Sequence, residues 1–377
     1  PGKMLLVDTE VGRIIDDKEL KADICSSQPY AKWLKDNVLQ LSDLPKPKEV
    51  PGTDFDTLLL RQKIFGYTSE DLNLLLTPMV ENGAEAAGSM GNDTPLAVLS
   101  DSPRLLYDYF KQIFAQVSNP PIDAIREELV MSLTSRLGHE RNILDPRPEH
   151  ARMLKLYHPI LSNEQLAQIK ALDKQDFYAT TLSMLFAAEA GTDGLAIALY
   201  KLCLQAENAV KSGSAFLVLS DRGAGKEQVP IPALLAVSAV HHHLILKRKR
   251  YKTGIIVETG EAREVAHFCL LISYGAGAIN PYLAFETFAQ MIRKKALPKE
   301  LTRKKANENY FKAIRKGMYK VFSKMGISTI QSYRGAQIFE AIGLNEDLIQ
   351  GHFSGTPSRI SGIGIEEIAQ ESLLRHE

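Results

Sequence analysis

Few stretches of this 377-residue sequence place reactive side chains at spacings that enzymes use. The run SDRGAGKE looks like a phosphate-binding loop, but Ser220 replaces the first glycine of that motif and Glu227 replaces its magnesium-binding hydroxyl. The run HERNI, which starts at His139, lacks the second histidine of the zinc-protease motif. The run GAGAIN, from Gly275, matches only the start of a dinucleotide fingerprint and precedes a strand. None of these motifs therefore predicts catalysis.

Histidine and cysteine, which bind transition metals, are poorly placed for that role. Histidines occupy positions 241–243 in an expected helix, where consecutive side chains point about 100° apart, so three in a row cannot converge on one ion. We expect one of them in the core and two at the surface or at a domain contact. The thiols of Cys25, Cys203 and Cys269 are far apart, without the clustered spacing of an iron–sulfur site, and are expected to be buried. No metal site is predicted within this chain.

Composition and charge argue against several classes of protein. Basic residues (Lys and Arg) and acidic residues (Asp and Glu) number 45 each, so no nucleic-acid footprint is expected. The basic run at 247–252 ends an expected helix, where the dipole favours cations, and is assigned to a solvated helix end. No apolar run approaches the roughly 20 residues of a membrane span, and the first residues lack the apolar core of a secretion signal. With three cysteines that cannot all pair, the sequence favours a cytoplasmic protein with no membrane or nucleic-acid partner.

One stretch without reactive groups stands out for the opposite reason. The run GSMGNDTP, residues 88–95, holds two glycines and a single charged side chain, Asp93, between two expected helices. Glycine permits close approach of the backbone to another group. The run is therefore either a turn or a surface past which something small travels, and the residues alone leave both readings open.

Short apolar runs alternate with helical runs from about residue 179 onward. The expected strands cover residues 180–187, 215–220, 254–260, 276–280 and 327–332. Strands that alternate with helices indicate βαβ units and a parallel sheet, and uniformly apolar strands are typical of a sheet covered on both faces. The sequence therefore predicts an α/β protein, in which a helical N-terminal part precedes an irregular, partial (β/α)-barrel-like parallel sheet. An open doubly wound sheet is the alternative.

The first half reads as mostly helical. A helix over 55–66 is expected to stop at Gly66, and Thr68 with Asp71 three residues later has the pattern of a helix N-cap. Further helices are expected over 103–117 and 119–138. Three segments follow from this pattern: an N-terminal segment (1–50), a mainly helical part (51–178) and a β/α part (179–377).

In either α/β architecture, ligands gather beyond the C-terminal ends of the parallel strands. The polar residues expected there are Ser220, Asp221, Arg222, Glu258, Thr259, Gly260, Asn280, Ser332, Tyr333 and Arg334. This rim is polar, but it lacks the convergent acid, base and nucleophile of an active site.

Several long stretches, taken together, resemble a known family. They are PGKMLLVDTEVGRI (1–14), the run from GSMGNDTP to ELVMSL (88–133), IPALLAVSAVHHHLI (231–245), YGAGAINPYLAFE (274–286) and SKMGISTIQSYRGAQIFEAIGL (323–344). In this order they resemble the central domain of glutamate synthase, and the similarity extends to about residue 364.

The resemblance implies a longer parent oxidoreductase. In that family an amidotransferase domain with a catalytic cysteine precedes the central domain, and a flavin (FMN) barrel with a three-iron, four-sulfur cluster follows it. Glutamine is hydrolysed in the first domain, and the ammonia reacts with 2-oxoglutarate at the second, where glutamate forms with electrons from ferredoxin or from an NADPH-oxidising small subunit. Residue 1 is Pro, so the nucleophilic cysteine is absent here, and this chain alone is expected to be inactive and to hold no cofactor.

The resemblance also gives the glycine-containing run a role. The central domain connects the two active sites and supplies part of the ammonia path, which needs small side chains, close backbone and little charge. The residues assigned to this path, or to a contact with a neighbouring domain, are Phe65, Gly66, Tyr67, Thr68, Gly88, Ser89, Met90, Gly91, Asn92, Asp93 and Thr94. The alternative from another class is a stand-alone scaffold that binds a small anion at the strand-end rim.

Overall fold

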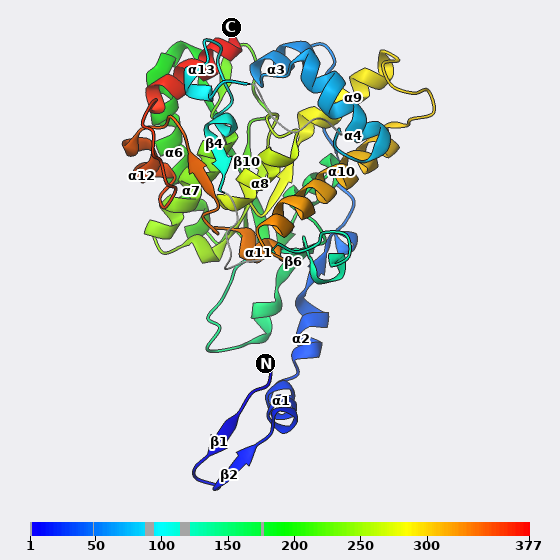
Figure 1. Ribbon diagram of the computed structural model, residues 1–377, viewed down its shortest axis with the longest axis vertical. Coiled ribbons are helices and arrows are strands. Elements are labelled where there is room, and N and C mark those ends of the chain that lie inside the picture. The colour runs from blue at the N-terminus through cyan, green and yellow to red at the C-terminus, as the bar shows by residue number, and fades with distance from the viewer. Residues whose placement is uncertain (1, 48, 87–93, 114–120, 175–176) are drawn as a thin grey trace.

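The chain folds into a rounded body with a slender N-terminal arm (Figure 1). The computed structural model describes residues 2–47, 49–86, 94–113, 121–174 and 177–377. The arm, defined here as residues 2–26, holds a two-stranded antiparallel hairpin, β1 (Leu6–Asp8) and β2 (Arg13–Ile15), and helix α1 (Asp17–Ser26). Helix α2 (Tyr30–Asn37) leads from the arm to the body.

Local side-chain hydrogen bonds build the arm without a core. The Asp8 carboxylate accepts from the backbone N–H groups of Glu10 and Val11, at 2.9 Å each, and thereby closes the hairpin turn. Asp16 caps helix α1 by accepting from the N–H groups of the first helical turn. No residue from 2 to 43 is buried, so the described chain covers the apolar side chains of the arm at most in part.

A five-stranded sheet forms the centre of the body. Its order is β13 (Ala278–Asn280), β12 (Gly254–Glu258), β10 (Phe216–Ser220), β8 (Phe177–Ser183) and β7 (Asp173–Lys174). The first four strands are parallel, and β7 is antiparallel to β8. Every residue of β10 and β12 is buried, as expected for parallel strands that are covered on both faces. The register places Ser183, Ser220 and Glu258 side by side at the C-terminal edge.

Helices cover this sheet on both sides and carry most of the apolar core (Figure 1). The helices are α3 (Leu58–Ile64), α4 (Thr77–Asn82), α5 (Asn163–Lys170), α6 (Gly191–Lys211), α7 (Ala233–Leu246), α8 (Val265–Ser273), α9 (Tyr282–Arg293), α10 (Arg303–Lys324), α11 (Ile330–Tyr333), α12 (Glu346–His352) and α13 (Ile365–His376). Helices α7 and α8 are apolar around most of their circumference because they lie between the sheet and other elements. A π-helical turn over Asp71–Leu76 precedes α4.

Smaller sheets complete the body. Strand β3 (Leu39–Gln40) pairs with β6 (Met153–Leu156), which also pairs with β5 (Ser135–Gly138). Strand β11 (Gln228–Pro230) pairs with β9 (Leu185–Ala187), and β14 (Phe339–Ala341) pairs with β4 (Phe110–Gln112). A single parallel bridge between Ile160 and Ile279 extends the central sheet beyond β13 without closing it. The α/β prediction, with an irregular and partial barrel-like parallel sheet, is confirmed.

Short 3-10 turns connect these elements. They span Leu41–Asp43, Ala97–Leu99, Leu106–Tyr109, Glu128–Val130, Pro148–Ala151, Ala188–Ala190 and Arg250–Lys252. Within the residues that the structure describes, no helix combines the length and the apolarity that crossing a bilayer requires.

Three predicted elements are wrong. The helices expected over 103–117 and 119–138 are, in their described parts, 3-10 turns and the short strands β4 and β5. Apolar residues there recur at helical spacing, but they pack against separate elements, and tertiary contacts override the local pattern. The second half of the strand expected over 327–332 is the one-turn helix α11. This helix begins after Thr329, whose hydroxyl accepts from the N–H of Ser332.

Candidate functional site

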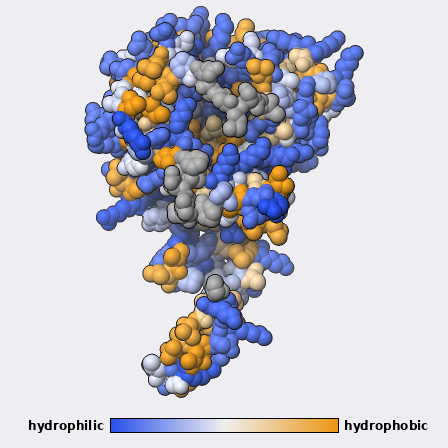
Figure 2. Space-filling view, in the orientation of Figure 1, coloured by the Kyte–Doolittle hydropathy of each residue, from blue (hydrophilic) through white to orange (hydrophobic). Residues whose placement is uncertain are grey.

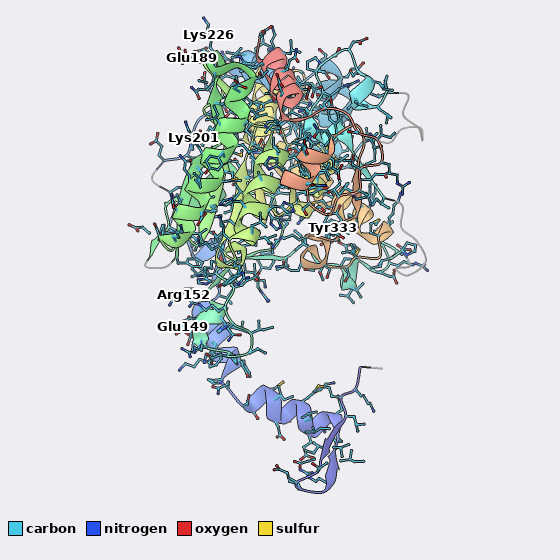
Figure 3. The ribbon with its side chains drawn as sticks, turned by 90° about the vertical axis from the view of Figure 1, so that its left-hand side faces the viewer. Glu149, Arg152, Glu189, Lys201, Lys226 and Tyr333 are labelled. Atoms are coloured by element: carbon cyan, nitrogen blue, oxygen red, sulfur yellow. The ribbon has the colours of Figure 1, made fainter. Side chains whose placement is uncertain are left out.

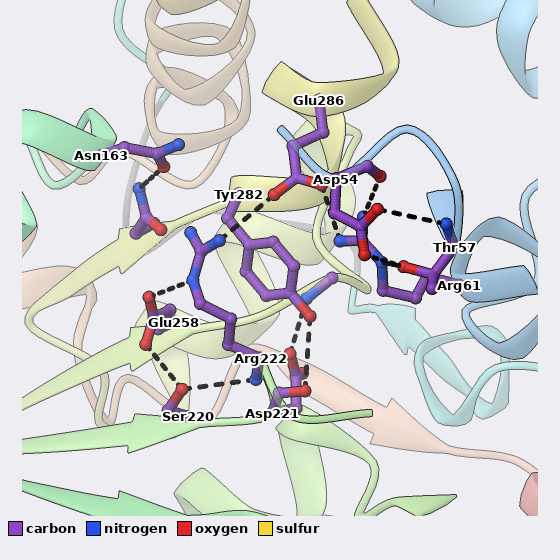
Figure 4. A network of polar contacts seen from close by, with 12 residues as sticks. Asp54, Thr57, Arg61, Asn163, Ser220, Asp221, Arg222, Glu258, Tyr282 and Glu286 are labelled. Atoms are coloured by element: carbon purple, nitrogen blue, oxygen red, sulfur yellow. Dashed lines mark hydrogen bonds and ion pairs between the residues drawn. The ribbon is translucent and has the colours of Figure 1, made fainter. Parts of the chain in front are cut away.

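Charged side chains meet at the C-terminal edge of the central sheet, and Glu258 is their first focus (Figure 4). Its carboxylate ends β12 and is 2% exposed. It accepts hydrogen bonds from Ser220 Oγ at 2.6 Å and Arg222 Nε at 2.7 Å, and it pairs with Lys170 Nζ at 2.5 Å. Burial works against ionisation, but Lys170 and Arg222 together lower the pKa of Glu258 below its ordinary value.

A second carboxylate, Glu286 on α9, lies on the other side of Arg222 (Figure 4). Glu286 is 1% exposed and pairs with Arg222 at 3.2 Å and with Arg61 of α3 at 2.6 Å. The Arg222 guanidinium also lies over the Tyr282 ring, 4.2 Å from its centroid. Arg61 donates to the backbone oxygen of Asp54 at 2.7 Å, so the connection preceding α3 is fixed as well. Alternating arginines and carboxylates thus join α3 and α9 to the sheet.

Asp221 is the third buried carboxylate of this edge and has no cationic partner among the described contacts. It accepts from Thr259 Oγ1 at 2.6 Å and from the N–H of Gly260 at 3.0 Å. Burial, with a smaller contribution from the nearby Glu261, raises the pKa of Asp221 to about 8. Asp221 is therefore mostly protonated at neutral pH, and it acts as a buried hydrogen-bonding group.

The predicted segment Phe65–Thr68 lies directly on this edge. Phe65 is fully buried, and its ring fills the space beside Gly260, where a Cβ atom would approach the ring to 2.5 Å. Arg263 fixes the segment by donating to the backbone oxygens of Phe65 at 3.1 Å and Gly66 at 2.8 Å. The same guanidinium lies 4.5 Å from the centroid of the Tyr67 ring.

Two local predictions within this segment are confirmed. Gly66 ends α3 with φ +66°, a conformation that favours glycine. Thr68 Oγ1 accepts from the N–H of Asp71, and the Asp71 carboxylate accepts from the N–H of Thr68, which is the reciprocal pattern of a capping box.

Most of the glycine-containing run lies outside the described residues. These members are Gly88, Ser89, Met90, Gly91, Asn92 and Asp93. Thr94 is exposed and precedes the turn that begins at Ala97. The part of the prediction that rests on these six residues therefore lies outside the described chain.

The remaining rim residues are divided between two edges of the sheet. Asn280 ends β13 and donates to Asn163 and to the backbone oxygen of Leu161. Arg334 instead lies with Thr253 and Gly254, where β12 begins, which is the opposite edge. Figure 3 shows the same separation, because Tyr333 and Lys226 lie toward opposite ends of the body. The prediction that 332–334 lie on the strand-end rim is wrong, because α11 is not a strand of this sheet.

The histidine run behaves as predicted in one respect. Each side chain has a different partner: His241 accepts from Arg250, His242 contacts the Ser238 oxygen, and His243 contacts Glu207. Within the described chain no group of three histidine, cysteine or acidic residues is arranged to hold a metal ion.

Sequence reasoning missed several members of the strand-end cluster. Lys170, Arg61 and Glu286 come from three helices, and Arg61 and Glu286 are 225 residues apart in sequence. No local pattern connects such residues. Tyr282 could have been found, because it follows the end of β13 by two residues, where ligand-facing side chains are expected.

The cofactors of the resembling family do not fit the residues present. Cys25 is exposed on the arm, whereas Cys203 and Cys269 are buried in helices α6 and α8, so the three thiols cannot share one cluster. The prediction that all three are buried is wrong for Cys25.

A flavin does not fit the strand-end edge either. Its phosphate would meet the buried carboxyl groups of Glu258 and Glu286, and the cations nearby are already paired with these two groups.

The fold and this edge define an α/β domain in which buried ion pairs occupy the usual ligand position. Residues 60–345 match the family described as the glutamate synthase central domain, and residues 1–33 match the class-II glutamine amidotransferases. The chain belongs to the glutamate synthase central-domain family.

Curated relatives agree with this assignment. The chain is 50% identical over 376 residues to the NADPH-dependent glutamate synthase large chain of Bacillus subtilis, and the match covers all of this chain and 24% of that protein. It is 42% identical to ferredoxin-dependent glutamate synthase 2 of Synechocystis, with 100% of this chain and 25% of that protein covered. The chain thus spans about a quarter of the length of these relatives. Among solved structures, the flavin-binding domain of baker's yeast flavocytochrome b2 has a TM-score of only 0.36 and 9% identity, over 79% of this chain and 96% of that chain.

Proposed function

We propose that this chain is the connector between the amidotransferase and flavin domains of a glutamate synthase, and that it forms part of the path for ammonia. The whole enzyme would hydrolyse glutamine, pass the ammonia inward and form glutamate from 2-oxoglutarate in the cytoplasm. Relatives are named as NADPH-, NADH- and ferredoxin-dependent forms, so either kind of electron donor is compatible with this chain. The connector itself performs no chemical step in this proposal.

The observation that carries the proposal is the uncovered arm. Apolar side chains gather on its hairpin (Figure 2), and Leu5, Val7, Val11 and Ile14 are exposed by 75%, 57%, 66% and 67%. Contiguous exposed apolar surface of this kind marks an interaction site. The arm lies within the match to the class-II amidotransferases. We therefore assign the amidotransferase domain of the same polypeptide as its partner.

A charged substitution on the arm tests, in the full-length enzyme, whether the amidotransferase domain contacts the arm. Val7 and Ile14 are cross-strand neighbours, so Val7→Asp places a carboxylate within the proposed apolar contact. We expect glutamine hydrolysis to fall by about tenfold or more, because burying an unpaired charge is costly. Leu129→Asp is the matched control, since Leu129 is 97% exposed on the body. Equal activity of the two variants would argue against the arm contact.

The ammonia path is proposed along the strand-end edge, where Phe65 lies beside Gly260, shortly after the end of β12. The segment is fixed by Arg263 and contains a left-handed glycine, so its backbone lies close to the end of the sheet. The run from Gly88 to Thr94 remains part of the proposal on the basis of its composition. The alternative scaffold, with a small anion at the same rim, is less favoured because the cations there are already paired with the protein's own carboxylates.

A pair of matched glycine changes tests this path in the full-length enzyme. Gly260→Ala brings a Cβ atom within 2.5 Å of the Phe65 ring, whereas Gly277→Ala brings one within 2.2 Å of Leu137 at the other edge of the sheet. Both variants must displace a buried side chain. We expect only Gly260→Ala to lower glutamine-driven glutamate formation, by about tenfold, while glutamine hydrolysis and ammonia-driven synthesis persist. Loss of ammonia-driven synthesis to the same extent would indicate packing damage and would count against the path.

A further inference from the structure

A cavity of about 370 Å³ lies at the N-terminal edge of the central sheet, beside the start of β12. Its lining includes four arginines and one carboxylate; the arginines are Arg136, Arg248, Arg250 and Arg334, and the carboxylate is Glu140. This volume lies within the range of pockets that hold small molecules. The strand-end edge described above has its charges paired, whereas this cavity carries an excess of positive charge.

Arg250 is committed to the protein itself. Its Nε donates to His241 Nδ1 at 2.9 Å, and its two terminal nitrogens donate to the backbone oxygens of Thr253 at 2.7 Å and Gly275 at 2.9 Å. Burial, followed by the nearby Arg334, lowers the pKa of Arg250 to about 10. The assignment of 247–252 to a solvated helix end is therefore wrong at this residue, which is half-buried and supports the cavity wall.

His241 contributes a neutral hydrogen-bond donor to the cavity and no positive charge. Burial, followed by Arg250, lowers the pKa of His241 to about 2, so the ring is neutral at ordinary pH. Because Nδ1 accepts the hydrogen bond from Arg250, the ring proton is on Nε2. The ring is held against Gly275, where a Cβ atom would approach Nδ1 to 2.4 Å, so its orientation is fixed.

Arg334 is the residue that points to a ligand. Its Nε and Nη2 atoms are buried, and within the described residues neither has a hydrogen-bond partner. These two nitrogens form the fork with which an arginine binds a carboxylate or phosphate in bidentate fashion. Burial lowers the pKa of Arg334, and Glu140 opposes that shift without a hydrogen bond to the fork. A buried, unpartnered fork is costly, and an anion in the cavity removes that cost.

The exposed arginines complete the arrangement. The side chains of Arg136 and Arg248 are exposed, in contrast to Arg334 and Arg250, so they lie on the solvent side of the cavity. Arg248 has a left-handed backbone (φ +54°), which places it in the turn that follows α7. A ligand whose first charged group meets the Arg334 fork would present any further charge to these two side chains.

We propose that this cavity binds a compact anion bearing a carboxylate or phosphate group. A rotation of the Arg334 side chain brings its fork onto the anion, and His241 Nε2 supplies a neutral donor. A cation is disfavoured in this cavity, because four arginines and only one carboxylate line it. The site is separate from the strand-end edge and independent of the proposed ammonia path.

Calorimetric titration of the 377-residue chain tests the proposal. The probes are inorganic phosphate and the dicarboxylate succinate, each at an ionic strength held constant with sodium chloride. We expect a Kd below about 1 mM for at least one of them. The stronger of the two identifies the anionic group. No heat from either probe, or a signal that chloride removes at equal ionic strength, would overturn the proposal.

Substitutions separate the fork from simple charge. Arg334→Gln is expected to weaken binding by about tenfold to a hundredfold, and Arg334→Lys by an intermediate factor, because lysine keeps the charge and loses the fork. Arg136→Gln is expected to weaken binding by a few fold. Because Arg136 is exposed, this variant should fold, and it tests the proposal even if the Arg334 variants do not fold. Arg303→Gln, exposed at the start of α10 and outside the cavity lining, is the matched control and should bind as the unchanged chain does. Equal weakening by Arg303→Gln, or full affinity in Arg334→Gln, would contradict the assignment.

Discussion

The two edges of the central sheet differ in whether their charged side chains are paired. At the C-terminal edge, Glu258 and Glu286 are paired with Lys170, Arg222 and Arg61, and all of these groups come from the described chain. At the N-terminal edge, arginines line a cavity and the fork of one of them has no partner within the same residues. In most α/β proteins the C-terminal edge holds the ligand. Here the charged side chains of that edge are paired with one another, and the edge that usually contributes only to stability has room and unsatisfied donors.

The largest expected effect on stability comes from breaking the ion pairs at the C-terminal edge. Glu286→Gln leaves Arg61 and Arg222 without the carboxylate that separates them, and both Arg61 and Glu286 are almost fully buried. We expect the free energy of unfolding to fall by about 3–5 kcal/mol, measured by urea denaturation of the chain. A loss below about 1 kcal/mol would mean that the ion pairs do not hold α3 and α9 on the sheet.

The matched change at the N-terminal edge is Arg334→Gln in the absence of any added anion. Because this residue is desolvated and its fork is unpartnered within the described chain, its removal should leave the free energy of unfolding within about 1 kcal/mol or raise it slightly. A loss as large as that of Glu286→Gln would show that Arg334 is a structural strut, and the contrast between the two edges would fail.

An effect between these two in size is expected in the pH dependence of stability from pH 5.5 to 7.5. The pKa of Asp221 is about 8 in the folded chain, mainly through burial, and an unfolded aspartate has a pKa of about 3.9. Between these values the folded state binds more protons than the unfolded state, so the contribution of Asp221 is present below pH 4 and is lost as the pH rises toward 8. Its slope is at most about 1.4 kcal/mol per pH unit.

Asp221→Asn isolates this contribution. The amide oxygen can accept from the Gly260 N–H, and the amide nitrogen can donate to Thr259 Oγ1, whose hydroxyl accepts as well as donates. Urea unfolding between pH 5.5 and 7.5 should therefore show a shallower decline in the variant than in the unchanged chain. Parallel curves would indicate that Asp221 is ionised in the folded state, and burial would then not be the dominant influence on its carboxylate.

The sequence predicted these two edges to very different extents. The buried strands β10 and β12 and the turn at Gly66 follow from local patterns, namely apolar runs, glycine and a capping pair. The ion pairs do not, because charges such as Arg61 and Glu286 come together only through tertiary packing over 225 residues. The local pattern places Arg334 at the wrong edge, because the run before it, over 327–332, is compatible with a strand although its second half forms the short helix α11.

The spacing of the Arg61–Glu286 pair also bears on how the chain folds. Contacts that close a loop of 225 residues form late, because the entropy of closing the loop must be overcome before the contact stabilises anything. Helix α3 is therefore expected to wait, during synthesis, until α9 has left the ribosome, while the segment between them builds the sheet. Phe65 and its neighbours, which cover the strand ends, would then be among the last parts of the domain to become ordered.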